Sequence, residues 1–172
     1  MEKIQRSGGQ LLLLILSLVG AGIAVYLTAV HYENVPLICS TRGLIDCSRV
    51  LSSPYSVVPG TTVPITVPGL AWCAVSAVLA IVGLRLLRPQ VRHRIQQAQF
   101  AWSLLGMLTV LYLVYVELVL LHTICAWCTG LHVVILITLL TTIVLLQRGE
   151  DEAEDSLPGR PQGSPLPYDG SV

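Results

Sequence analysis

Four apolar runs, each about 20 residues long, limit what this chain can fold into more than any other feature. They cover about 11–30, 69–87, 100–121 and 124–146. A helix needs roughly 20 apolar residues to cross the hydrocarbon core of a bilayer. Only 12% of the residues are charged, whereas a soluble domain carries about 25%. The sequence therefore predicts an all-α membrane protein, a bundle of four transmembrane helices.

The first run follows Lys3 and Arg6, as the apolar segment of a secretory signal would. Its length of about 20 residues exceeds the roughly 7–15 residues of such a segment. We therefore expect a retained span and not a cleaved signal.

Basic residues predict the topology, because cytoplasmic loops carry an excess of Lys and Arg. Only Arg42 and Arg49 fall in the loop 31–68. If both termini are cytoplasmic, that loop and the short connection 122–123 face outward, where disulfides persist. The other eight basic residues then share the inner side: Lys3, Arg6, Arg85, Arg88, Arg92, Arg94, Arg148 and Arg160.

The two ends of the chain differ in composition from the apolar part. An acidic run at 150–155 precedes a stretch rich in Pro, Gly and Ser, which is typical of disordered segments. The expected organisation is a cytoplasmic N-terminus over 1–10, a four-helix domain over 11–146 and a disordered cytoplasmic tail over 147–172. No basic nucleic-acid patch is visible, so we expect no nucleic-acid partner.

Cys125 and Cys128 form a Cys-Ala-Trp-Cys motif at the start of the fourth run. If Thr123 caps that helix, both thiols lie in its first turn, where the positive helix end favours a thiolate. This spacing is suited to making and breaking one disulfide. The alternatives are a zinc site completed by His122 and His132, since zinc prefers four ligands, or two inert buried thiols. We expect redox chemistry and no metal.

Cys39 and Cys47 lie in the only long loop, which is rich in proline. One interpretation is a purely structural disulfide. The other is a mobile shuttle that takes electrons from a soluble dithiol and passes them to the motif, because exchange requires the two pairs to meet. Cys73 has no partner within its span and is interpreted as a small core residue.

Two polar residues within the runs have open roles. His132 falls one helical turn after Cys128, so it can either hydrogen-bond a quinone carbonyl or bond to a neighbouring helix. Glu117 is costly within a span, and either reaches the interface or has a functional or well-paired position.

Together these residues resemble the vitamin K epoxide reductase family, in its bacterial branch. The resemblance covers about residues 10–146 and rests on four cysteines at these positions and on several motifs. The motifs are Ala24-Val-Tyr-Leu-Thr-Ala-Val-His31, Cys47-Ser-Arg-Val-Leu-Ser-Ser53, Tyr112-Leu-Val-Tyr-Val-Glu117, and Cys125-Ala-Trp-Cys128 followed by His132.

The resemblance implies a four-helix bundle around a quinone pocket, capped by the outer loop 31–68. It implies that Cys39 exchanges with a reduced thioredoxin-like partner, that Cys47 exchanges with Cys125, and that Cys128 faces the quinone. Ser53 and His132 would lie near that quinone. The acceptor would be ubiquinone or menaquinone/phylloquinone, and the activity would be disulfide formation in exported proteins, in a bacterial plasma membrane.

Two departures bear on this expectation. The asparagine that vertebrate members place before the second span is absent, since the segment reads Thr66-Val-Pro-Gly69. This favours plain quinone reduction over epoxide reduction, which remains an alternative, as does a non-enzymatic protein with a structural disulfide or zinc. No thioredoxin-like domain is fused to the chain, so the partner would be a separate protein. An oxidase of the disulfide-bond-forming protein B type is disfavoured, because there the motif cysteines precede the other pair.

Overall fold

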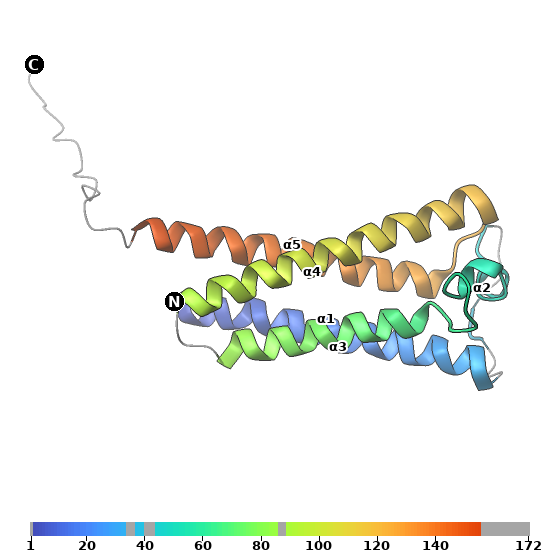
Figure 1. Ribbon diagram of the computed structural model, residues 1–172, viewed down its shortest axis with the longest axis horizontal. Coiled ribbons are helices and arrows are strands. Elements are labelled where there is room, and N and C mark those ends of the chain that lie inside the picture. Colours follow the sequence, from blue (N-terminus) through green and yellow to red (C-terminus); the bar gives the residue numbers. More distant parts are fainter. Residues whose placement is uncertain (1, 34–36, 40–43, 86–88, 156–172) are drawn as a thin grey trace, which may run out of the picture.

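The computed structural model describes residues 2–33, 37–39, 44–85 and 89–155. Four long helices run side by side along the molecule (Figure 1). They are α1 (Glu2–Glu33), α3 (Thr66–Arg85), α4 (Pro89–Tyr115) and α5 (Ala126–Asp155). α1 packs against α3 and α5, and α4 packs against the same two helices. The four-helix membrane bundle predicted from the apolar runs is confirmed.

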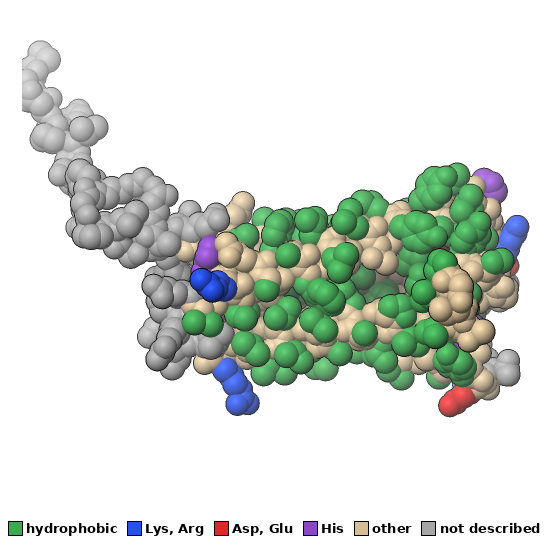
Figure 2. Space-filling model, in the orientation of Figure 1, with side chains coloured by type: hydrophobic (Ala, Val, Ile, Leu, Met, Phe, Trp, Pro, Cys, Tyr) green, Lys and Arg blue, Asp and Glu red, His purple; other side chains and the backbone are tan. Residues whose placement is uncertain are grey.

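Each long helix contains a segment long and apolar enough to cross a membrane. These candidate spans are Gly8–Glu33, Thr66–Arg85, Val91–Leu121 and Ala126–Gly149. Figure 2 shows apolar side chains over the middle of the visible face and charged side chains near the two ends. Large apolar side chains such as Leu18, Val78 and Leu108 are exposed, as expected for a surface that contacts lipid.

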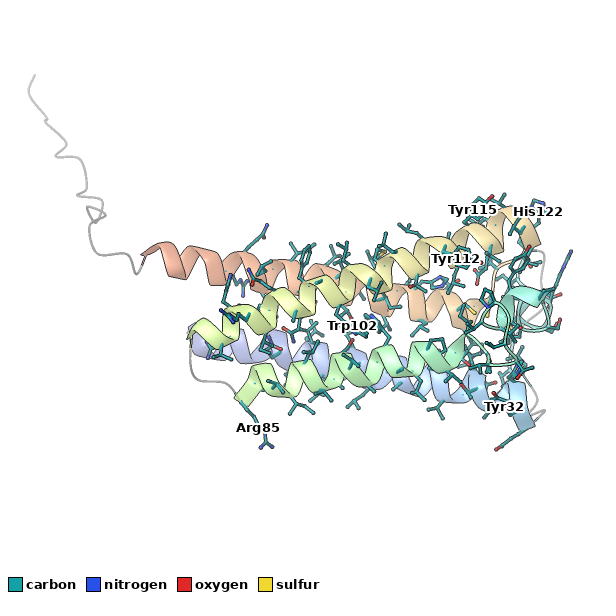
Figure 3. The ribbon with its side chains drawn as sticks, in the orientation of Figure 1. Tyr32, Arg85, Trp102, Tyr112, Tyr115 and His122 are labelled. Atoms are coloured by element: carbon teal, nitrogen blue, oxygen red, sulfur yellow. A yellow bond between two sulfur atoms is a disulfide. The ribbon has the colours of Figure 1, made fainter. Side chains whose placement is uncertain are left out.

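The remaining helical elements cluster at the end of the bundle opposite the N-terminus (Figure 1). They are α2 (Cys47–Leu51), the 3-10 turn η1 (Pro54–Ser56) and η2 (Val116–Leu121), a π-helix that continues α4. Arg85, at the end of α3, lies at the other end of the molecule from Tyr32 and His122 (Figure 3). α5 extends to Asp155, beyond the end of its apolar run near Leu146. The tail from 156 onward lies outside the described residues.

Reciprocal polar contacts tie the helices together. Gln10 of α1 and Gln99 of α4 exchange two side-chain hydrogen bonds of 3.2 and 2.9 Å. The Trp72 indole donates to the Trp102 carbonyl at 3.1 Å, and the Trp102 indole donates to the Trp72 carbonyl at 3.2 Å. Gly106 makes this approach possible, because a Cβ there would lie 2.8 Å from the Trp72 ring. Such close contacts and hydrogen bonds hold helices together in lipid, where helix–helix association gains little from the hydrophobic effect.

Candidate redox site

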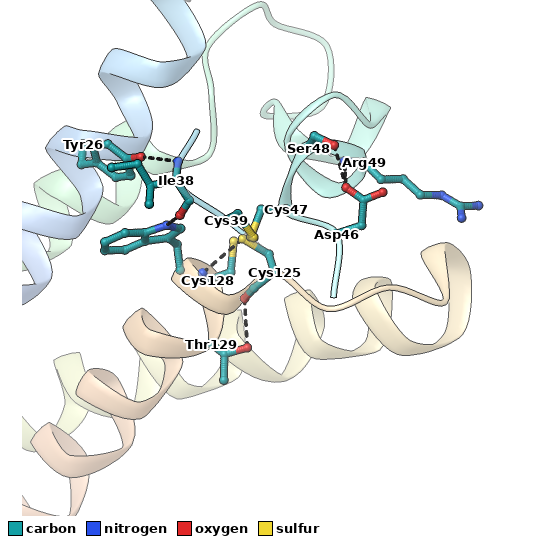
Figure 4. Close-up of a disulfide and its surroundings, with 11 residues drawn as sticks. Tyr26, Ile38, Cys39, Asp46, Cys47, Ser48, Arg49, Cys125, Cys128 and Thr129 are labelled. Carbon is teal, nitrogen blue, oxygen red and sulfur yellow. Dashed lines mark hydrogen bonds between the residues drawn. A yellow bond between two sulfur atoms is a disulfide. The ribbon is translucent and has the colours of Figure 1, made fainter. Parts of the chain in front are cut away.

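Four cysteines gather at the end of the bundle that carries α2. Cys39 and Cys47 form a disulfide with a Cα–Cα distance of 6.2 Å, and Cys125 and Cys128 are free thiols. Figure 4 shows this disulfide beside the two thiols at the start of α5. Cys47 and Cys125 are fully buried, whereas Cys39 is partly exposed. Cys73 lies apart from them in the core beside Trp72, as its interpretation as a core residue predicted.

A short backbone pairing brings the loop to the motif. The Ile124 N–H donates to the Leu44 carbonyl at 2.8 Å, and the Asp46 N–H donates to the Ile124 carbonyl at 3.2 Å. This parallel bridge joins the residues just before Cys47 to the residue just before Cys125. This bridge therefore brings the loop disulfide and the two motif thiols next to each other.

Asp46 then starts α2, whose first residue is Cys47. Its carboxylate accepts hydrogen bonds from the Ser48 hydroxyl at 2.6 Å and from the Arg49 N–H at 3.1 Å. The Ser48 bond and the Arg49 bond lower the pKa of Asp46, because they stabilise the charged form. An N-cap of this kind fixes where a helix begins. The cap thus sets the position of Cys47 against the bundle.

The helix that carries the motif is capped by one of its own cysteines. α5 begins at Ala126, and the Cys128 N–H donates to the Cys125 sulfur at 3.3 Å. Thr123, expected as the N-cap, instead directs its hydroxyl to the Leu121 carbonyl at 3.4 Å. The expectation for Thr123 was wrong because the chain stays extended through Ile124 to pair with the loop. Cys125 therefore occupies the N-cap position, where the helix end favours negative charge.

Hydrogen bonds to the Cys125 sulfur favour its ionised form. A hydrogen bond from the Cys128 thiol lowers the pKa of Cys125, and the backbone N–H groups of Cys128 and Trp127 act in the same direction. Burial and the charge of Glu117 oppose this shift. A lower thiol pKa makes Cys125 a good leaving group in thiol–disulfide exchange.

Two aromatic side chains hold the segment that carries Cys39. The Ile38 N–H donates to the Tyr26 hydroxyl at 3.0 Å, and the Trp127 indole donates to the Ile38 carbonyl at 2.9 Å (Figure 4). The Tyr26 and Trp127 rings themselves lie 4.8 Å apart. Tyr26 belongs to α1 and Trp127 to the motif, so this aromatic clamp (Tyr26 and Trp127 on Ile38) links three parts of the site. The sequence alone offered no signal for it.

Loosening the clamp should slow exchange between the two pairs. Trp127→Phe keeps an aromatic ring but removes the donor to Ile38, and one hydrogen bond is worth about 1 kcal/mol, or roughly fivefold. We expect turnover with a protein dithiol to fall by about that factor and turnover with dithiothreitol to change little. Tyr32→Phe is the matched control, since Tyr32 is an exposed residue at the end of α1. Equal losses with both reductants would contradict this role.

Cys128 opens onto a cavity of about 450 Å³ between the helices. His132 lines it one turn deeper in α5 and is buried. The indoles of Trp72 and Trp102 form part of the wall, and Thr66 and Thr109 are among its few polar residues. The remaining lining is apolar and includes Leu27, Ile65, Val75, Leu105, Val110, Leu113, Leu131 and Ile135.

Ser53 lines a second, smaller cavity of about 50 Å³, and not the larger one. Its hydroxyl donates to the Val50 carbonyl at 2.7 Å. Cys128, Leu27 and Thr66 line both cavities. Of the two residues expected near a quinone, His132 shares the larger cavity with Cys128, and Ser53 shares the smaller one with it.

Glu117, which the sequence marks as a costly charge within a span and as the end of one family motif, is a site residue. It is 5% exposed, and its carboxyl is hydrogen-bonded to the Cys125 backbone N–H and to the Cys128 thiol. It also lines the smaller cavity with Cys128. Of its open interpretations, the structure gives the buried, paired position and not the interface.

In the described part of the chain, no three His, Cys, Asp or Glu residues are grouped so that they could hold a metal. A dithiol and a disulfide at the mouth of an apolar cavity, in a bundle of four membrane spans, define a membrane redox enzyme that works through cysteines. A model of the vitamin K epoxide reductase family matches residues 11–143. The chain belongs to this family of oxidoreductases. No curated protein matches it.

Proposed function

We propose that this protein is a quinone-dependent thiol oxidase that promotes disulfide formation in exported proteins. Electrons would run from a reduced thioredoxin-like partner to Cys39 and Cys47, then to Cys125 and Cys128, and then to a membrane quinone. The observation that carries this proposal is the contact chain of the site. A partly exposed disulfide lies beside a buried dithiol, and the second thiol of that dithiol lines an apolar cavity.

The burial of the loop cysteines supports the order of the first exchange. Cys39 is partly exposed and Cys47 is fully buried, so a partner thiolate reaches the Cys39 sulfur and displaces Cys47. The second partner thiol then attacks the partner sulfur of this mixed disulfide and releases Cys39. The partner leaves as a disulfide, and Cys39 and Cys47 hold its two electrons as thiols.

The second exchange takes place with the motif in its disulfide form. The Cys47 thiolate attacks the Cys125 sulfur, and Cys128 leaves toward the cavity. The Cys39 thiol then attacks Cys47, restores the loop disulfide and releases Cys125, whose lowered pKa makes it a good leaving group. The described state, with a Cys39–Cys47 disulfide and two motif thiols, corresponds to the end of this exchange.

The larger cavity suits a quinone ring. A flat apolar ring would be bounded by the Trp72 and Trp102 indoles and the aliphatic side chains, and His132 and Cys128 would be the groups available to its polar atoms. When bound, the quinone supplies a two-electron acceptor that takes up two protons. Cys125 and Cys128 together would give up two electrons as their disulfide forms again, and His132 would hydrogen-bond the ring. Ubiquinone and menaquinone/phylloquinone both meet these requirements.

The direction of insertion follows from charge. The basic residues Arg85, Arg92, Arg94 and Arg148 lie in or next to the ends of spans away from the cysteines. By the positive-inside rule, both termini are cytoplasmic and the four cysteines face the outer side of a bacterial plasma membrane. Disulfides form and persist on that side of the membrane.

The test is to follow quinone absorbance after adding a reduced thioredoxin-like protein to the purified protein in detergent. We expect stoichiometric quinone reduction and thiol loss, with both quinone types offered in separate runs. Cys73→Ala is the matched control, since Cys73 lies in the core and lines neither cavity. Reduction of the vitamin K epoxide at a comparable rate would favour the epoxide reductase alternative. Failure to reduce any quinone, or one bound zinc per chain, would contradict the proposal.

A further inference from the structure

Glu117 is a buried acid that the electron path does not use. It is the only acidic side chain among the buried residues that the structure describes. A carboxylate within a span is expensive and requires a partner or a purpose. The groups that act on its carboxyl are both in the motif, the Cys125 backbone N–H and the Cys128 thiol, and Cys128 lines the same small cavity as Glu117. Glu117 therefore faces the pair that must release protons when it is oxidised.

The turn between α4 and α5 is built to hold this acid in place. Glu117 lies in η2, a π-helix, and such segments frequently occur at functional sites. Its backbone carbonyl accepts the N–H of His122 and, at 3.0 Å, the N–H of Thr123. His122 takes a left-handed conformation with φ of 51°, which is uncommon for a residue other than glycine. The chain thus reverses direction around Glu117 on its way to Cys125.

The single proton of the Cys128 thiol has two acceptors within reach. One is the Cys125 sulfur, and the other is the Glu117 carboxylate. The Cys125 sulfur must lose its own proton when the disulfide forms, so it cannot keep the proton of Cys128. An amide in place of the acid would satisfy the Cys125 N–H equally well, so that contact alone does not require a charge here. Glu117 is left as the proton acceptor.

We propose that Glu117 is the base that takes the Cys128 proton when the motif is oxidised. The inference rests on the proposed function, in which a quinone is the oxidant. Two S–H bonds break and one Cys125–Cys128 S–S bond forms, two electrons go to the quinone, and two protons end on the hydroquinone oxygens. One of these protons comes from Cys125. The other passes from Cys128 through Glu117, which lines the cavity adjoining the one that holds the ring.

The other groups that titrate near Glu117 are few. At the start of α5 they are the N-cap residue Cys125 and, within the helix, Cys128. His31 of α1 and Tyr55 of η1 line the same small cavity, whereas His132 lines the larger one. Of the residues that line the small cavity, only His31 can carry a positive charge. A His31→Gln variant therefore serves as a second comparison for the pH dependence of the rate.

The first test measures how fast the fully reduced protein reduces quinone in a single turnover, between pH 6 and pH 9. General-base catalysis contributes about 10²–10⁴-fold, so Glu117→Gln should lower this rate at least about 100-fold near neutral pH. The rate of the variant should then rise with pH toward that of the wild type, because the thiol ionises unaided. Glu33→Gln, an exposed acid at the end of α1, is the matched control. A rate within threefold of wild type at all pH values, or an equal loss at all pH values, would overturn the proposal.

A second test needs no quinone and remains available if Glu117→Gln does not fold. Quinone-free protein is oxidised chemically from dithiol to disulfide, and the infrared difference spectrum is recorded. We expect a carboxylic-acid carbonyl band to appear on oxidation in the wild type and in Glu33→Gln, and to be absent from a folded Glu117→Gln. No such band in the wild type would contradict the inference. If the band appears but no quinone is reduced, the proposed function has failed and the proton transfer stands.

Discussion

Cys128→Ser should lose quinone reduction by at least about 10³-fold, with any reductant. Removal of the group that performs the chemistry typically costs this much or more, and Cys128 is the only cysteine that lines the larger cavity. A serine keeps the size of the side chain and the backbone N–H that donates to Cys125, so the fold should be retained. The measurement is quinone absorbance with a reduced thioredoxin-like protein and, separately, with dithiothreitol.

The comparison variant for this result is Cys73→Ala, which removes a thiol from the core and should keep nearly full activity. Full activity of Cys128→Ser with dithiothreitol would mean that electrons leave the protein from another sulfur, and the proposed order would be wrong.

Cys39→Ser should separate the two reductants. The partner thiolate loses the exposed sulfur that it attacks, so turnover with a thioredoxin-like protein should fall by more than about 100-fold. Dithiothreitol is small enough to attack the motif at Cys128, which is partly exposed, and its turnover should stay within about threefold. The two rates are measured in the same quinone assay, on the same preparation.

The loop disulfide also closes a short loop of sequence separation 8, so its loss has a structural effect that requires its own control. The double variant Cys39→Ser with Cys47→Ser removes the unpaired inner thiol and should behave like Cys39→Ser. Melting temperatures of all three proteins show whether the loop remains seated. Unchanged turnover with both reductants, or an equal loss in a variant with a lowered melting temperature, would favour the purely structural interpretation of the disulfide.

The sequence predicted the four spans and the gathering of the cysteines because both depend on local patterns. An apolar run that is long enough to cross a bilayer by itself indicates a membrane-spanning helix. An even number of crossings places the loop pair and the motif at one end of the bundle, and the structure has them there. The role of each sulfur remains a proposal.

Contacts between segments that are distant in the chain could not be predicted from the sequence. The Tyr26 and Trp127 hydrogen bonds to Ile38 join residues 12 and 89 positions apart. The loop–motif bridge at Ile124 keeps the chain extended there, and the helix cap consequently falls on Cys125 and not on Thr123. The position of Glu117 depends on the π-helix and the left-handed His122, and neither has a local signature strong enough to predict.

The paired amides of Gln10 and Gln99 restrict where the proposed quinone could pass between the bilayer and the protein. Parting α1 from α4 at that level would strand polar groups in hydrocarbon, where each unsatisfied group costs several kcal/mol. Gln96 adds a further tie from α4 to the Leu145 carbonyl of α5 at 3.2 Å. These hydrogen bonds therefore hold α1, α4 and α5 together at the end of the bundle that lacks the four cysteines. In the proposed function, a quinone would therefore enter from the bilayer near the other end of the bundle, where Cys128 lines the larger cavity.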